Sequence, residues 1–455
     1  MTLSAKYPMK WLKRVLITLV ALLAIAIAVP FFVTLDDYIP RIEKEVTAKL
    51  KEPVSIKSIK FVALPLPHVT VDGITVGKAG DVKVGKVTAT PDLFSLLSAT
   101  KVIRSIEIKS LVLTQKAIDK IPVWSKTDDA KSPALVRIES IRLDDALLKL
   151  DKASFGPFDA RVNLDPKGEP EDASITTQDG KLKIFVKPGK SNYLIDATAK
   201  AWKAPVGPAI LFDELIVKGV ATLNDASFSQ VSAKLYGGTI TGNATAGWLK
   251  GLQIKGNLDI NQVELKSLVP LLAPGTNMSG KLNAKPVFSA AAATANQLAN
   301  ALRLETSFNV RDGVLHGVDI QKAATNLIKK DSGGGETRFD VLSGHLVMER
   351  EAQRFTDLKI VSGALGADGN VNISARKELS GRINASLKAG KITAANVPLN
   401  VSGTVEHPML LPTGATMAGA AVGTAILGPG VGTSIGMKAG QFAEKLFGRK
   451  EENKR

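Results

Sequence analysis

The sequence predicts a mainly β protein, in which an N-terminal transmembrane helix is followed by many short antiparallel strands and few short helices. Two observations carry this prediction. An uncharged run of 21 residues, Val15–Leu35, lies near the start of the chain. From Pro53 onward, apolar and polar residues alternate with a period of two, as in a sheet with one dry and one wet face. The alternating strands and helices of a parallel α/β fold are missing.

The uncharged run is long enough to cross a bilayer core of about 30 Å. Basic residues precede it and Asp36 and Asp37 follow it, so we expect a cytoplasmic N-terminus and a body beyond the membrane. A cleaved signal peptide is the alternative, because Ala26-Ile27-Ala28 offers a cleavage site. The apolar residues continue through Val33, which exceeds a typical signal sequence and favours an uncleaved anchor.

Composition excludes several classes of protein. With 455 residues, 45% hydrophobic and 22% charged, the chain is too apolar to be intrinsically disordered. It has no cysteine, which excludes disulfides, thiolate nucleophiles and cysteine-ligated metals. The net charge of +16 indicates an anionic partner, either phospholipid or nucleic acid. Scattered basic residues and an aromatic content of only 5% argue against nucleic acid.

One strand pattern recurs in Ile56–Phe61, Ile103–Ile108 and Ile138–Leu143. The last two apolar residues of each copy are two positions apart and therefore share one face of a sheet. These six residues are the candidate binding residues: Ile59, Phe61, Ile106, Ile108, Ile141 and Leu143. The sequence predicts hairpin turns at four Asp-Gly dipeptides: Asp72-Gly73, Asp179-Gly180, Asp312-Gly313 and Asp368-Gly369.

Three helices are predicted beyond the anchor. Residues 36–50 place Ile39, Ile42, Val46 and Leu50 on one stripe, and Asp36 or Asp37 can cap the start. Residues 91–98 are expected to form a short apolar plug. A third helix, over residues 318–330, has Ile320 and Ala324 on its apolar stripe. We interpret the last two as packing elements.

No catalytic or cofactor-binding motif survives inspection, so we predict a protein that is not an enzyme and has no cofactor or metal. Residues 275–281 match the start of a phosphate-binding loop, but Leu282 replaces the required Ser or Thr, and the following residues read as a strand. The four histidines are remote from one another. Adjacent pairs such as Asp144-Asp145 point to opposite faces of a strand and cannot converge on one bond.

The C-terminal segment is unusual because His407–Met437 contains no charged Asp, Glu, Lys or Arg. Small residues are spaced one helical turn apart, as close helix packing requires. They are Gly419, Gly423, Gly432, Gly436 and Gly440. We predict a Gly/Ala-rich helical hairpin over residues 413–455, broken at Pro429 and ending in a basic tail. A flexible linker is the alternative, although linkers are usually richer in Ser and charge.

Several motifs in this order resemble the AsmA family. The resemblance begins with Asp36-x-Tyr38-x-x-x-Ile42 and continues with Glu52-Pro53-Val54, where Lys51 departs from the family's usual Gly. It includes the Pro-containing passage Phe61–Val76. Near the other end, Thr337-x-Phe339-x-x-Leu342-x-Gly344 and Val401-x-Gly403-Thr404-x-x-x-Pro408 resemble two further family motifs. The middle of the chain, about 150–300, is similar only in its alternation.

The resemblance implies a bacterial inner-membrane anchor and a periplasmic body built as an elongated antiparallel sheet curled into a groove, the β-taco. It further implies phospholipid as a ligand, the inner membrane and a periplasmic or outer-membrane protein as partners, and a role in outer-membrane biogenesis. The implied segments are the stub and anchor (1–35), an N-terminal β region with a leading helix (36–150), a central groove region (151–300), a C-terminal β region (301–412) and the hairpin with its tail (413–455).

Two alternatives remain open at this level. The apolar face of the sheet is either a trough that shelters acyl chains or an ordinary closed core. Likewise, the protein either carries phospholipid or acts as a periplasmic scaffold that modulates outer-membrane protein assembly without carrying lipid.

Overall fold

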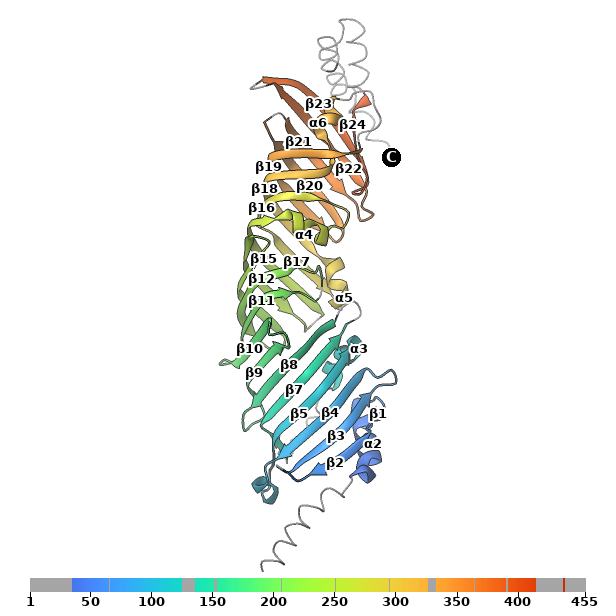
Figure 1. Cartoon of the computed structure of the whole chain (residues 1–455), viewed down its shortest axis with the longest axis vertical. Helices are drawn as coiled ribbons and strands as arrows, with labels where there is room; N and C mark the ends of the chain where they lie inside the picture. Colours follow the sequence, from blue (N-terminus) through green and yellow to red (C-terminus); the bar gives the residue numbers. More distant parts are fainter. Residues whose placement is uncertain are drawn as a thin grey trace, which may run out of the picture. The chain divides into compact units, whose positions relative to one another are not determined.

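The computed structural model describes residues 35–64, 66–124, 136–150, 154–205, 207–249, 251–293, 295–325, 333–363, 365–389, 392–414 and 437. The chain divides into two units, residues 1–194 and 195–455. Both are mainly β, as the alternation predicts, and their elements are labelled in Figure 1.

The first unit begins with a short helix and ends with an antiparallel strand pair. Its elements are η1 (Asp36–Tyr38), α2 (Ile39–Leu50), β1 (Val54–Ser55), β2 (Ser58–Val62), β3 (His68–Val76), β4 (Val82–Pro91), η2 (Phe94–Leu97), β5 (Lys101–Thr114), α3 (Gln115–Trp124), β6 (Val136–Ile138), β7 (Ser140–Lys149), β8 (Ser154–Leu164), β9 (Pro170–Thr177) and β10 (Leu182–Pro188). Strand β11 (Tyr193–Lys203) spans the boundary between the units.

The sheet of the first unit is mixed, which corrects the prediction of a purely antiparallel sheet. Strand β5 runs parallel to β6 and β7, whereas β2, β3, β4 and β5 pair antiparallel in order, as do β7, β8, β9 and β10. Parallel neighbours need a long crossover connection, and α3 lies in this one. The two copies Ile103–Ile108 and Ile138–Leu143 of the recurring pattern are therefore parallel neighbours, with Ile106 opposite Ile141.

The second unit is also built mainly of strands, and its described residues include three α-helices. Its elements are β12 (Leu211–Ala221), β13 (Asp225–Leu235), β14 (Gly238–Gly247), β15 (Leu252–Glu264), α4 (Leu265–Leu272), β16 (Met278–Ala284), β17 (Val287–Ala292), α5 (Ala295–Leu298), η3 (Ala299–Ala301), β18 (Arg303–Val318), α6 (Ile320–Thr325), β19 (Gly333–Glu349), β20 (Ala352–Val361), β21 (Leu365–Ile373), β22 (Leu379–Ala389), β23 (Ile392–Gly403) and β24 (Pro408–Pro412). Strand β16 confirms that the sequence around Lys281 is a strand.

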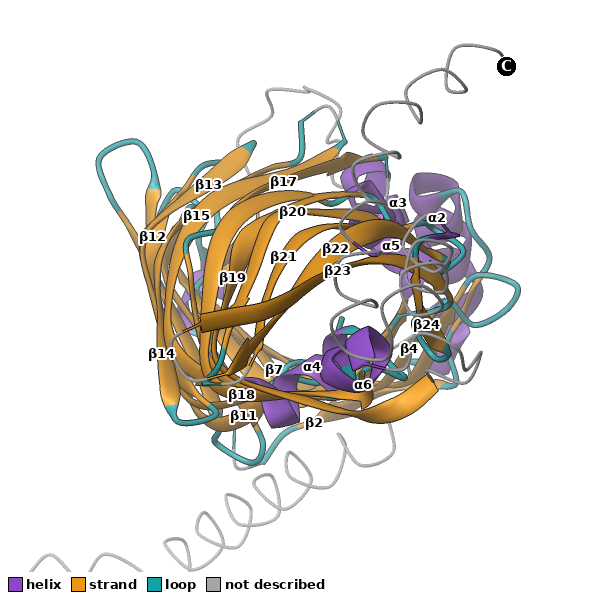
Figure 2. Ribbon diagram, turned by 90° about the horizontal axis from the view of Figure 1, so that it is seen from above, coloured by secondary structure: helices purple, strands orange, loops and turns teal. Residues whose placement is uncertain are grey.

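The C-terminal end of the second unit closes around a core. Strands β18 to β24 pair in chain order, yet β24 also contacts β18 and β19, which lie several strands away along the ladder. Helix α6 contacts β19, β22, β23 and β24, and Figure 2 shows it enclosed by strands. Ile320 and Ala324 of α6 are 3% exposed, which confirms the predicted packing helix within the described residues.

Three of the four predicted Asp-Gly hairpin turns are wrong. Asp179-Gly180 does join β9 to β10, but Asp72-Gly73, Asp312-Gly313 and Asp368-Gly369 lie inside β3, β18 and β21. Asp312 and Gly73 have φ angles of 51° and 65°. These residues tolerate the left-handed conformation that hairpin turns need, and a β-bulge inside a strand needs it too.

Three of the bulges in the described strands share a hydrogen-bonding pattern. A residue with positive φ leaves the ladder, and its backbone N–H donates to a side-chain oxygen on the neighbouring strand. The three examples are Asp145 to Asp159 Oδ1 (3.0 Å), Gln262 to Asn283 Oδ1 (3.2 Å) and Asp357 to Asn370 Oδ1 (3.0 Å). Each bulge bends its strand without leaving a backbone donor unsatisfied.

The predicted helix over residues 36–50 is confirmed as η1 and α2, but its capping differs. Asp36 Oδ1 accepts the N–H of Ile59 (2.8 Å) instead of capping the helix, so it fastens β2 to the start of the body. Among the predicted apolar stripe, Leu50 packs against a small core of Val76, Val82 and Ala117. The Trp124 Nε1 of α3 donates to the Leu50 carbonyl at 3.0 Å.

The predicted plug over residues 91–98 is wrong as a packing element. Its helix, η2, leaves Phe94 85% and Leu97 95% exposed. Apolar residues at helical spacing indicate a helix, but they do not decide whether its side chains are buried.

Two predicted segments lie outside the described residues. These are the membrane anchor, except for Leu35, and the glycines of the C-terminal hairpin, Gly419, Gly423, Gly432, Gly436 and Gly440. Within the part of the chain that is described, no helix is long and apolar enough to cross a bilayer. Met437 is described; it is helical, 7% exposed, and belongs to the core of the second unit.

The end of α2 generates a stability prediction. Lys51, where the AsmA family usually has Gly, adopts φ 56° and ψ 27°, a conformation costing a non-glycine residue about 1–2 kcal/mol. We expect Lys51→Gly to stabilise the first unit by about 0.5–1 kcal/mol, measured by urea denaturation. The control Ala48→Gly, inside the same helix and exposed, should cost about 1 kcal/mol. Destabilisation by Lys51→Gly would contradict this account of the helix end.

Candidate functional site

Two rows of apolar side chains cross the sheet of the first unit. They follow the residue pairing from β2 through β3, β4, β5, β7, β8 and β9 to β10 without interruption by a polar residue. The first row is Phe61, Val69, Ala89, Ile106, Ile141, Val162, Ala173 and Val186; the second is Ile59, Val71, Val87, Ile108, Leu143, Ala160, Ile175 and Ile184. We call these residues the apolar rows.

The opposite face between the two rows is polar. Its cross-strand series is Lys60, Thr70, Thr88, Glu107, Arg142, Arg161, Ser174 and Phe185. Glu107 and Arg142 form an ion pair at 3.7 Å on this face. Only Phe185, at the last strand, breaks the polar series. The sheet therefore has one apolar and one polar face across eight strands.

The apolar rows are not sealed in a core. Ile59 is 3% exposed, whereas the other members are half-buried. Neither of the two hydrophobic core clusters found among the described residues contains a member of the rows. An apolar face of this length without a covering layer is a candidate site for an apolar ligand.

All six candidate residues from the sequence lie in the apolar rows. Ile59 and Phe61 are on β2, and the other four are on the parallel neighbours β5 and β7. Residues of β3 and β10, such as Val71 and Ile184, carried the same alternation in the sequence. Those of β8 and β9, such as Ala160 and Ala173, are small and gave little signal, so only pairing identifies them.

A line of residues that leave the strand pairing, which we call the crease, crosses the sheet at one end of the apolar rows. Gly73 in β3, Gly85 in β4, Ser110 in β5 and Asp145 in β7 are left out of the pairing at corresponding levels. Ser110 Oγ donates to Asp145 Oδ2 at 3.0 Å across this line. The crease therefore separates the apolar rows from the part of the face that the helices cover.

Beyond the crease, α2 and α3 cover the face. Leu111 and Leu113 of β5 pack with Val76, Val82 and Ala117 there. Lys120 of α3 makes an ion pair with Glu52, and its Nζ lies 3.5 Å from Asp81 Oδ2. The hydrogen bond to Glu52 is the main cause that raises the pKa of Lys120. The helices thus cover one end of the apolar face, and no other described α-helix of the first unit packs on the rows.

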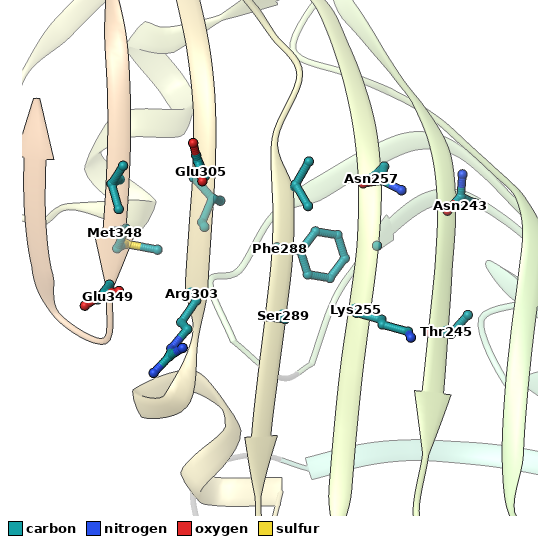
Figure 3. A pocket seen from close by; sticks show the side chains of 14 residues that line it. Asn243, Thr245, Lys255, Asn257, Phe288, Ser289, Arg303, Glu305, Met348 and Glu349 are labelled. Carbon is teal, nitrogen blue, oxygen red and sulfur yellow. The ribbon is translucent and has the colours of Figure 1, made fainter. Parts of the chain in front are cut away.

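The second unit contains cavities with mixed lining. One of about 530 Å³ lies along strands β14 to β19 and is shown in Figure 3. Lys255 and Arg303 line it together with Glu305 and Glu349, so its charges balance. The pairing of β15, β17, β18 and β19 puts Phe288, Leu304 and Met348 on the opposite face of the sheet from Lys255 and Arg303. A second cavity of about 950 Å³ shares Lys255 and Arg303 and extends to Trp248, Leu249 and Arg350 at the strand ends.

No group of three or more acidic or histidine side chains that could hold a metal ion occurs among the described residues. His345 Nε2 lies 3.1 Å from Glu305 Oε1, and His316 Nδ1 lies 3.7 Å from Glu336 Oε2, so each histidine on β18 or β19 has one carboxylate neighbour.

The motif at residues 337–344 is structural. Thr337 Oγ1 donates to the Val318 carbonyl (2.7 Å) and accepts the N–H of Ile320 (3.0 Å), which positions α6. Phe339 lies against Gly313 of the neighbouring strand, where a Cβ atom would come within 2.4 Å of its ring. Leu342 is 8% exposed in the core. The motif residues build the closed end of the second unit.

Comparison with models of protein families identifies the same family that this motif resembles. The model of the AsmA family matches residues 5–132 and 215–357, which together make up more than half of the chain. The chain belongs to the AsmA family. The match includes the apolar rows from β2 to β5 and the motif at 337–344, whereas the motif at 401–408 lies beyond it. No curated protein and no solved structure matches the chain significantly.

An Asp substitution should destabilise the half-buried apolar rows less than the buried core of the second unit. We expect Ile106→Asp to cost about 1–2 kcal/mol, because the carboxylate keeps contact with water. Val310 is 1% exposed in the closed end. Val310→Asp should lower the free energy of unfolding by roughly 3–5 kcal/mol, because the charge is buried without a partner. Chemical denaturation of both variants measures the difference. Equal losses would show that the rows are a sealed core.

Proposed function

We propose that the protein binds phospholipid with its acyl chains lying along the apolar rows. One observation carries the proposal: the rows are continuous across eight strands and half-buried, and no core cluster of the described residues includes them. Each methylene group that moves from water onto such a surface gains about 0.8 kcal/mol. An acyl chain that lies along the rows is therefore stabilised relative to one in water.

Membership of the AsmA family is consistent with outer-membrane biogenesis or lipid transport. We propose the specific form in which the chain is anchored by Val15–Leu35 in a bacterial inner membrane, with its N-terminus cytoplasmic and its body in the periplasm. The charge asymmetry around the uncharged run supports this orientation. The net charge of +16 supports attraction to anionic phospholipid.

The second unit contributes differently in this proposal. The cavity of about 530 Å³ has Lys255 and Arg303 beside Glu305 and Glu349, so it offers a headgroup no net charge. The C-terminal end of this unit is filled by α6 and by core residues such as Val397 and Leu399. We therefore expect lipid along the rows and none in this closed end. The protein binds or conducts lipid and catalyses no reaction.

A scaffold that modulates outer-membrane protein assembly without lipid is the competing proposal. Mass spectrometry of phospholipid that co-purifies with the full chain separates the two. We expect phospholipid with the unaltered chain and a severalfold loss with Ile106→Asp, because a carboxylate in the first row repels acyl chains.

Ser105→Asp is the matched control, since it adds the same charge to the neighbouring residue on the other face of β5. This variant should retain its phospholipid. A chain that folds and carries no phospholipid in any variant would favour the scaffold. Equal phospholipid in both variants would exclude the rows as the binding site.

A further inference from the structure

Two loops leave the same end of the sheet in the first unit. The loop over residues 63–67 connects β2 to β3, and the loop over residues 92–100 connects β4 to β5. Strands β3 and β4 are antiparallel neighbours, with Val69 opposite Ala89. The start of β3 at His68 and the end of β4 at Pro91 therefore lie at the same end of the strands, and both loops project from that end.

These loops expose five large apolar side chains. The exposed fractions are 49% for Leu64, 58% for Leu66, 47% for Leu93, 85% for Phe94 and 95% for Leu97. We call these five residues the loop patch. Single exposed apolar side chains are ordinary on protein surfaces, but a group on adjacent loops marks a contact with another apolar surface.

The longer loop holds its apolar tip on a hydrogen-bonded base. Asp92 Oδ1 accepts the N–H groups of Phe94 (2.9 Å) and Ser95 (3.1 Å). Ser95 is 8% exposed, and its Oγ accepts the N–H of Val102 at 2.8 Å. The Arg104 guanidinium donates to Asp92 Oδ2 at 2.6 Å. Phe94 and Leu97 therefore project from a turn that these hydrogen bonds hold in place.

The Asp92 carboxylate at the foot of this loop is charged at neutral pH. The hydrogen bond from Arg104, followed by the backbone N–H of Ser95, holds the pKa of Asp92 below its ordinary value. Asp92 is ionised at neutral pH, and the lowered pKa means that it keeps its charge and its bond to Arg104 further into the acidic range. Exposed Lys60 and Lys101 flank the two loops and add positive charge beside the apolar tip.

The chain enters the first unit close to these loops. The uncharged run ends at Leu35, whose N–H donates to the Ile59 carbonyl at 3.1 Å. Ile59 lies on β2, which leads within a few residues into the loop over 63–67. Helix α2 then carries the chain to β1, which pairs with the opposite end of β3 at Val76. Leu35 is thus bonded to the start of β2, four residues or about 13 Å of strand before the loop over 63–67.

We infer that the loop patch is a membrane-contacting surface that inserts into a phospholipid bilayer. The bilayer is the occupant because the apolar run of 21 residues ends at Leu35, about 13 Å of strand from the patch, and because flanking lysines complement anionic headgroups. Leu, Phe and neighbouring Lys side chains are the residues that interfacial segments use. The inference goes beyond the proposed lipid binding, since the patch can contact a bilayer whether or not the rows carry phospholipid.

Single cysteines test the inference cleanly, because the chain has no cysteine of its own. Phe94→Cys and Leu97→Cys place an environment-sensitive fluorophore in the patch of the full chain. Ala79→Cys is the matched control, in the exposed turn between β3 and β4 at their other end. The ten residues of β4 separate the two ends by about 33 Å.

The labelled chains are reconstituted into vesicles of phosphatidylethanolamine and phosphatidylglycerol, with or without a doxyl-labelled phospholipid that quenches fluorescence in the bilayer. We expect the quencher to remove most of the emission at positions 94 and 97 and little at position 79. A blue-shifted emission at 94 without quenching would mean that a protein covers the patch, which overturns the inference. Equal quenching at all three positions, or none, also overturns it.

A second set of variants separates insertion from proximity. Leu66→Cys reports from the other loop, with Phe94→Ser and Leu97→Ser combined in the same chain. Because both substituted side chains are exposed, the fold should be retained, which circular dichroism checks. We expect quenching at position 66 to fall severalfold when the tip is made polar. Unchanged quenching would show that the anchor alone sets the depth, and the patch would have no role in insertion.

Discussion

A sheet with an apolar face, and with no second sheet over it among the described residues, is the constraint on which the structure depends. The alternation of apolar and polar residues creates such a face across β2 to β10, and burial of apolar surface is the main favourable term in folding. The two units meet the constraint in different ways. In the second unit, β24 approaches β18 and β19 and encloses α6, so Val310, Val397 and Leu399 become fully buried. In the first unit, α2 and α3 cover only the part beyond the crease, and the apolar rows remain half-exposed.

Local irregularities make these solutions possible. Asp145, Gln262 and Asp357 bend their strands, and neighbouring side chains satisfy the backbone N–H groups that leave the ladder. Glycines admit aromatic rings from the neighbouring strand: a Cβ at Gly313 would meet the Phe339 ring at 2.4 Å, and one at Gly256 would meet Phe288 at 2.8 Å. These pairs fix the register, because a slip by one residue would move a ring to the other face.

Much of this could be predicted from the sequence, since the face on which a strand residue lies depends only on its neighbours. The period-two pattern therefore identified the strands and put Ile59, Ile106 and Leu143 on one face. It could not identify the parallel pairing of β5 with β7, which depends on a crossover through α3. Nor could it distinguish the turn at Asp179-Gly180 from the irregularity at Asp312-Gly313, because turns and bulges need the same backbone conformation. Phe94 and Leu97 were expected to pack inward, because apolarity alone does not say which surface covers a side chain.

The central claim is that the apolar rows face phospholipid while the opposite face does not. Site-specific photocrosslinking in cells tests this most directly, with a photoreactive phenylalanine analogue at position 143 or at position 142. Leu143 belongs to the second row, and its neighbour Arg142 lies on the polar face of the same strand. The account predicts a covalent phospholipid adduct, detected by mass spectrometry, from position 143 and none from position 142. An adduct of equal yield from both positions, or crosslinks from position 143 only to other parts of the chain, would contradict it.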